Sequence, residues 1–141
     1  KFENKNTKDA KFWKNIYEDE IDGFILTGND MIYYHVIRKA RKPAFLNIGL
    51  IDMIPYLPIT AGKIKKAVEI IYNLPFNKPP TKHVLKIPSS LIKNNFELKT
   101  KNDWVLLNKE FKIKAIVVPS HWIINLPKIF ESENYSYYLI N

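Results

Sequence analysis

The apolar residues of this chain fall into short blocks that prolines, glycines and charged residues interrupt. No block approaches the run of about 18 apolar residues that a membrane-spanning helix needs, so the sequence predicts none. The length of 141 residues and the hydrophobic fraction of 46% suit one domain with one core. Blocks of both helical and strand-like periodicity predict a domain that contains helices and strands.

Two segments, residues 8–20 and 61–73, have the spacing of amphipathic helices. Their apolar faces are Phe12, Trp13, Ile16 and Tyr17 in the first, and Ile64, Val68, Ile71 and Tyr72 in the second. Thr7 and Thr60 precede them as candidate caps. The acidic residues 18–20 are interpreted as a solvated helix end, in preference to a metal site.

Residues 23–34 have the pattern of a β-hairpin, because two short apolar runs flank the turn-forming group Gly28-Asn29-Asp30. Residues 48–57 and 83–87 are further strand candidates, and Ser89 is expected to cap one turn of helix. Residues 74–82 contain three prolines and are expected to form an extended arm.

The last third of the chain is predicted to be rich in strands. Residues 96–100 and 104–107 flank a turn-like group and suggest a second hairpin, followed by strands over 110–118 and 135–140. We expect one small core there, formed by Trp104, Ile116, Val118 and Tyr137. The predicted fold class is α+β, with short helices, a β-hairpin module and a small antiparallel C-terminal sheet. Residues 1–141 are expected to form one domain, in which a proline-rich arm (74–82) joins residues 1–73 to a β-rich part (83–141).

The positive charge is concentrated in the middle of the chain. The formal net charge is +8, yet residues 33–102 alone carry +10, whereas residues 1–32 and 103–141 carry −2 and 0. A sequence rich in Lys, Ile and Asn is also what A/T-rich coding produces, but such a bias would spread evenly. The focused charge therefore favours a basic surface that binds phosphates.

The densest basic run directly follows two tyrosines and a histidine. The candidate RNA-binding residues are Tyr33, Tyr34, His35, Arg38, Lys39, Arg41 and Lys42, together with Lys63, Lys65 and Lys66. Aromatic rings beside cations are a common way to grip RNA. The alternative interpretation is that the tyrosines are half-buried packing residues at a strand end.

Signals for catalysis are weaker. The absence of cysteine excludes thiolate chemistry, and the three histidines, His35, His83 and His121, form no compact ligand pair, so neither metal nor cofactor is expected. Asp103 and Glu110 with Lys112 have the pattern of a metal-dependent nuclease. If Asn108-Lys109 forms a two-residue turn, however, Asp103 lies at the open end of that hairpin and Glu110 beside the turn, too far apart to share one ion. A solvated strand face is the preferred interpretation, and the protein is expected not to be an enzyme.

Residues 103–141 resemble the C-terminal end of the fourth small-subunit ribosomal protein in its organellar form. In that family a Trp opens a strand, a second strand ends in proline, and an Asn-Leu-Pro group precedes a last aromatic strand. The matching residues here are 104–109, 115–119, Asn125-Leu126-Pro127 and 135–138. Upstream, residues 23–29 are similar to the hairpin of the family's RNA-binding module, and residues 50–54 to its closing strand. The family's arginine-rich helix is not recognisable.

The resemblance implies a structural constituent of the small ribosomal subunit that binds its rRNA and neighbouring ribosomal proteins. It implies a mitochondrial location, with a cytoplasmic one as the alternative. Two other functions remain open at this point. One is a DNA-binding or nuclease-like protein of a mobile element, and the other is a protein-interaction subunit of a large complex. No membrane and no small-molecule substrate are expected.

Overall fold

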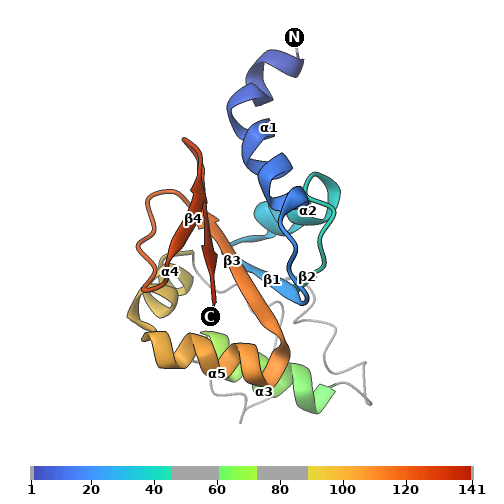
Figure 1. The fold of residues 1–141 in the computed structure, drawn as a ribbon. Coiled ribbons are helices and arrows are strands. Elements are labelled where there is room, and N and C mark those ends of the chain that lie inside the picture. Colours follow the sequence, from blue (N-terminus) through green and yellow to red (C-terminus); the bar gives the residue numbers. More distant parts are fainter. Residues whose placement is uncertain (1, 46–60, 73–88, 141) are drawn as a thin grey trace, which may run out of the picture.

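The computed structural model describes residues 2–45, 61–72 and 89–140, with the side chains of 2–8, 61–65 and 68 outside the description. These residues form an α+β fold of five helices and five strands (Figure 1). In chain order the elements are α1 (Phe2–Glu18), β1 (Phe24–Thr27), α2 (Asp30–Arg38), β2 (Ala44–Phe45), α3 (Ala61–Tyr72), α4 (Ser89–Leu98), α5 (Lys101–Phe111), β3 (Ile113–Pro119), β4 (Lys128–Glu131) and β5 (Tyr135–Leu139). No helix in these ranges is long and apolar enough to cross a membrane.

A single mixed sheet organises the described residues, in the strand order β2-β1-β3-β5-β4. β1 runs parallel to both β2 and β3, with Leu26 opposite Ile116. β5 lies between β3 and β4 and is antiparallel to both of them, with Val117 opposite Tyr137. The predicted small antiparallel C-terminal sheet is therefore confirmed, and β1 and β2 extend it into a mixed sheet.

Helices cover the two faces of this sheet separately. Ile116 and Val118 of β3 belong to a core with residues of α3, α4 and α5. Ala115 and Val117, on the alternate positions, belong to a second core with α1 and α2. Because side chains alternate along a strand, a strand buried on both faces is apolar at every position, which explains the apolar run of β3. Figure 1 shows α1 and α2 on one side of the sheet and α3 and α5 on the other.

The first predicted hairpin is wrong. Residues 24–27 are a strand as expected, but the chain then enters α2 and forms no second strand. Asn29 is the N-cap of that helix, and its side-chain oxygen accepts the Ile32 N–H at 2.8 Å. Asn and Asp favour helix caps as strongly as they favour turns, and in this protein Asn29 caps a helix. Tyr33, Tyr34 and His35 therefore lie on a helix and not at a strand end.

The second predicted hairpin is also wrong, since its two arms are α4 and α5. The helix expected at Ser89 is ten residues long rather than one turn. Thr100 and Asp103 form a capping box in which each side chain accepts the backbone N–H of the other residue, at 3.2 and 2.9 Å. The supposed turn, residues 101–103, is thus the first turn of α5.

Other predictions of secondary structure are confirmed. The two amphipathic helices appear as α1 and α3, the first beginning earlier than expected. The strands predicted over 110–118 and 135–140 appear as β3 and β5, although Glu110 and Phe111 belong to α5. β4 and the two-residue β2 were not predicted. The predictions for residues 48–57, 74–82 and 83–87, and for the side chains of Ile64 and Val68, lie outside the described residues.

The small core predicted for the C-terminal part is only partly right. Trp104, Ile116 and Val118 share one core, and all three are fully buried. Tyr137 is equally buried but faces the opposite side of the sheet, with α1 and α2. The mistaken hairpin had placed Trp104 on the same sheet as Tyr137, whereas Trp104 approaches that sheet from a helix on one face.

Candidate functional site

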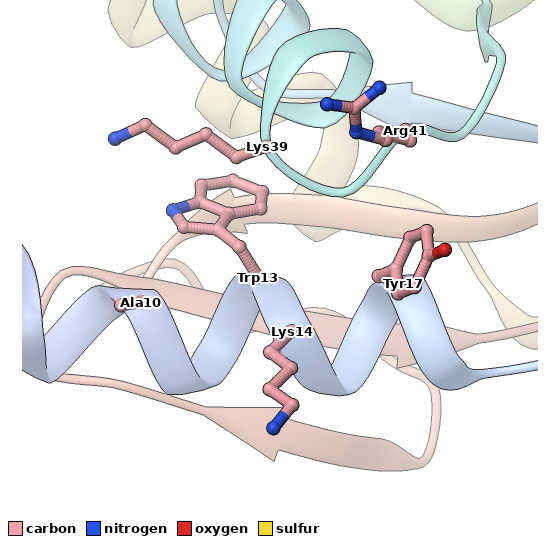
Figure 2. A pocket seen from close by; sticks show the side chains of 6 residues that line it. All are labelled: Ala10, Trp13, Lys14, Tyr17, Lys39 and Arg41. Carbon is pink, nitrogen blue, oxygen red and sulfur yellow. The ribbon is translucent and has the colours of Figure 1, made fainter.

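A cleft of about 390 Å³ lies where α1 packs beside the C-terminal end of α2. Its lining residues are Ala10, Trp13, Lys14, Tyr17, Lys39 and Arg41 (Figure 2). Three of the six are cations and two are aromatic. This composition differs from that of two other hollows in the described part of the chain, each of which pairs one lysine with one acidic residue.

The wall from α1 follows directly from helical spacing. Ala10, Trp13 and Tyr17 are three and four residues apart, so their side chains lie on one face over two turns. Ala10 leaves open space at one end, because its side chain is a single methyl group. Trp13 is only 2% exposed, whereas Tyr17 is 54% exposed. The cleft therefore has a fixed aromatic floor and a more accessible aromatic ring at its rim.

The opposite wall is made by the turn that ends α2. The Lys39 N–H donates to the His35 carbonyl at 2.8 Å, and the Lys42 N–H donates to the Val36 carbonyl at 3.2 Å. This second bond joins residues six apart in sequence and closes the turn after α2, in which Arg41 adopts the left-handed conformation with φ of 52°. The turn reverses the chain so that Lys39 and Arg41 both reach the cleft.

The left-handed conformation of Arg41 is a source of backbone strain. Glycine adopts it freely, whereas a residue with a Cβ pays roughly 1–2 kcal/mol. Strained positions of this kind gather at functional sites more often than elsewhere. The presence of arginine at a position where glycine would fit better therefore favours a functional role for the Arg41 side chain.

The cations of the cleft differ in their pairing. Among the described residues, neither Lys39 nor Arg41 takes part in a salt bridge, and both are exposed. Lys14 lies 4.0 Å from Glu18 on the same helix, and its ammonium points away from the other five side chains in Figure 2. Two unpaired cations thus remain available to an anion in the cleft.

The His35 ring packs against the Trp13 ring that forms the floor of the cleft. It lies 5.5 Å from the Trp13 ring and 6.0 Å from the Tyr135 ring. Burial, and then the charge of Lys39, hold the pKa of His35 below its usual value of 6.5, while the carboxylate of Asp9 acts in the other direction. His35 is therefore neutral near pH 7, and the positive charge of the cleft comes from Lys39 and Arg41.

Not all of the predicted RNA-binding residues meet at this cleft. Arg38 lies over the Tyr34 ring at 5.5 Å, and Tyr34 in turn contacts Tyr33 edge-on at 5.5 Å, which forms a separate exposed patch on α2. Lys42 follows the αL turn and is half-buried. Of the residues predicted on this part of the chain, Lys39 and Arg41 line the cleft, and the others lie near it.

The lysines of α3 belong to another surface. α3 packs on the opposite face of the sheet from α2, through Ala67 and Ile71. Lys66 lies 3.6 Å from Glu110 on α5. The side chains of Lys63 and Lys65 lie outside the described residues. The structure thus does not join the two predicted basic groups through Lys66.

Sequence reasoning missed the α1 wall of the cleft. Trp13 and Tyr17 were assigned to an apolar stripe, and that assignment is right for Trp13. The one residue of the stripe that could have indicated a surface site is Tyr17, because it lies at the edge of the stripe, next to the acidic residues 18–20. A tyrosine there tolerates exposure, but nothing in the sequence indicated that the basic turn of α2 would pack beside it.

The nuclease-like pattern has a different geometry from the one expected. Asp103 and Glu110 lie on the single helix α5, about 10 Å apart along its axis at 1.5 Å per residue. Asp103 accepts the Thr100 N–H, and Glu110 lies beside Lys66. The described residues contain no group of three or more acidic, histidine or cysteine side chains placed to hold a metal ion.

What the cleft can bind follows from its own chemistry: a buried indole, an accessible phenol ring, and two cations that form no salt bridge with any residue the structure describes. Such a set suits a small anion that also carries a flat ring. Compared with known proteins, the chain matches no family model, no curated protein and no solved structure.

Proposed function

We propose that the protein binds RNA through this cleft and the adjoining turn of α2, and that it serves as a structural constituent of a ribonucleoprotein. The observation that carries the proposal is a pair of cations, Lys39 and Arg41, which lie beside two aromatic rings and form no salt bridge within the described ranges. Ammonium and guanidinium groups release counterions from phosphates when they bind, and aromatic rings stack on unpaired bases.

Charge distribution supports the proposal at a larger scale. Arg38 and Lys42 flank the two cleft cations in sequence, so four positive charges lie within five residues. The acidic residues 18–20 follow Tyr17 at the end of α1, which makes the surface asymmetric rather than uniformly basic. An asymmetric field orients a polyanion as well as attracting it.

The small ribosomal subunit and its rRNA stay the predicted setting, in mitochondria. The strand that the resemblance implies at Trp104 is the helix α5, and the implied hairpin after Gly23 leads into α2. The RNA-binding proposal therefore rests on the cleft and not on the resemblance. Co-sedimentation of the tagged chain with small subunits from isolated mitochondria would test the setting separately.

The test of RNA binding is the dependence of affinity on salt concentration. Each phosphate contact contributes a slope of about −0.7 in log K against log salt for a single strand. We expect a steep slope for the parent chain and a shallower one when Lys39 and Arg41 are both replaced by Ala, by about 0.7 for each of the two cations that contacts a phosphate. Fluorescence anisotropy with a labelled RNA and an identical DNA measures this.

Three outcomes would separate the functions considered. A flat salt dependence in the parent chain would remove the phosphate-contact proposal altogether. Equal affinity for DNA and RNA of the same sequence would favour a general nucleic-acid binder. A double variant with the parental slope would show that RNA contacts lie elsewhere on the chain.

A further inference from the structure

We propose that the cleft holds one unstacked nucleotide of a single-stranded RNA, its phosphate at the Trp13 and Lys39 end and its base between Tyr17 and Arg41. This inference rests on the RNA-binding function proposed above and specifies the RNA class and the mode of contact. A volume of about 390 Å³ is within the range of small-ligand pockets. The bases of a duplex stay stacked, so a duplex would present only its backbone here.

The phosphate end is marked by a buried donor without a partner. Trp13 Nε1 is buried and has no hydrogen-bond acceptor among the described residues. Leaving such a donor unpaired is costly, and an arriving acceptor recovers that cost. Figure 2 shows the indole nitrogen at the same end of the cleft as the Lys39 ammonium. A phosphate oxygen that accepts from the indole at this end would have its charge balanced by the Lys39 ammonium.

The base end is marked by the accessible ring of Tyr17. Figure 2 shows Arg41 across the cleft from it, on the turn that follows α2. Unpaired bases in RNA complexes stack on aromatic rings and on guanidinium planes, and this end of the cleft offers both. The acidic residues 18–20 follow Tyr17 directly, so an anion is repelled at this end. The charge distribution thus places the phosphate at the Lys39 end.

The first experiment compares single-stranded RNA of about ten nucleotides with its duplex by fluorescence anisotropy. We expect the parent chain to prefer the single strand. Tyr17→Ala should reduce single-strand affinity about ten-fold, the size of one base–aromatic stack, and leave duplex affinity unchanged. Tyr17→Phe keeps the ring and should keep the affinity. Because Tyr17 is largely exposed, neither change should affect folding, which a thermal melt verifies.

The second experiment observes the indole N–H signals in an NMR titration with uridine monophosphate. Trp104 provides an internal control, because its Nε1 is likewise buried without a partner in the described part of the chain but lies in the core on the other face of the sheet. We expect the Trp13 signal to move on titration and the Trp104 signal to stay in place. Movement of neither signal, or of both equally, would contradict the phosphate contact.

The two proposals fail in different ways. If the parent chain binds no RNA, the proposed function itself is wrong. If it binds duplex and single strand equally, and Tyr17→Ala binds both as the parent does, RNA binding stands and the single-nucleotide site is wrong. A chain that binds uridine monophosphate but no RNA strand would overturn both and assign the cleft to a free nucleotide.

Discussion

Arg41 has a backbone conformation that is unfavourable for a residue with a side chain. Its φ of 52° lies in the left-handed region that glycine adopts most easily, in the turn that follows α2. Lys112 is in the same conformation, with φ of 57°, at the end of α5. The two residues carry the same charge and the same strain, but only Arg41 lines the cleft. They therefore form a matched pair in which strain and function can be separated.

We predict that Arg41→Gly stabilises the fold and weakens RNA binding. Relief of the left-handed strain, less the greater entropy of glycine in the unfolded chain, should raise the free energy of unfolding by up to about 1 kcal/mol. Lys112→Gly should give a similar gain and leave RNA affinity nearly unchanged. Urea unfolding and anisotropy on both variants measure this. An equal loss of affinity in the two would mean that net charge, and not the cleft, governs binding.

His35 makes the stability of this region depend on pH. Its pKa is lowered in the folded protein, by burial first and by Lys39 second. Between the usual value of 6.5 and the lowered one, the unfolded chain binds more protons than the folded chain. The contribution of neutral His35 is therefore complete above 6.5 and is lost as the pH falls below it.

The prediction is that the melting temperature falls on acidification from about pH 7.5 to 5.5, and falls less in His35→Gln. Glutamine keeps a polar side chain of similar size but does not titrate. A melting series across this pH range in parent and variant is the measurement. Parallel curves for the two proteins would show that His35 contributes nothing to the pH dependence.

At the scale of elements, the predictions from sequence succeeded wherever periodicity ran over many residues. α1, α3, β3 and β5 all follow from such patterns. Both hairpins failed at residues that serve equally well in turns and in caps, Asn29 and Thr100. The choice between these roles depends on packing against the sheet, which short-range patterns do not contain. The cleft was half predicted for the same reason: charge density indicated Lys39 and Arg41, but tertiary packing adds Trp13 and Tyr17.

The cap at Thr100 is directly testable. Thr100→Ala removes the side-chain acceptor for the Asp103 N–H and should lower the free energy of unfolding by about 1 kcal/mol. Asn102→Ala, an exposed change on the same helix turn outside the capping box, should lower it little or not at all. Chemical denaturation of the two variants compares them. Equal stability of the two would mean that the capping box does not hold this end of α5.

At the scale of the whole molecule, two cores on opposite faces of one sheet share the strand β3. Trp104 anchors the core on the α5 side, where its ring meets Phe96 edge-on at 5.6 Å and Lys99 lies over it at 5.8 Å. The cleft lies on the other side, with α1 and α2. Stability and binding should therefore respond to different aromatic residues.

We predict that Trp104→Ala lowers the free energy of unfolding by roughly 3–5 kcal/mol, because it leaves a large cavity in a closed core. Tyr17→Ala, on the exposed rim of the cleft, should change it by less than about 0.5 kcal/mol. Thermal melts of both variants, followed by RNA binding of whatever remains folded, give the comparison. A Trp104→Ala protein that melts like the parent yet loses RNA would make Trp104 a stacking residue and reverse this assignment.

The parallel pairing of β1 with β3 also has a consequence for how the chain is made. Leu26 and Ile116 are neighbours in the sheet, but almost the whole chain between them must be synthesised before they can meet. Contacts of such long sequence separation form slowly, because a large loop must close first. During translation Ile25 and Leu26 therefore lack their β3 partners until residues 113–117 have been synthesised. A nascent chain that has not reached residue 113 therefore exposes an apolar strand, which is the kind of segment that chaperones bind.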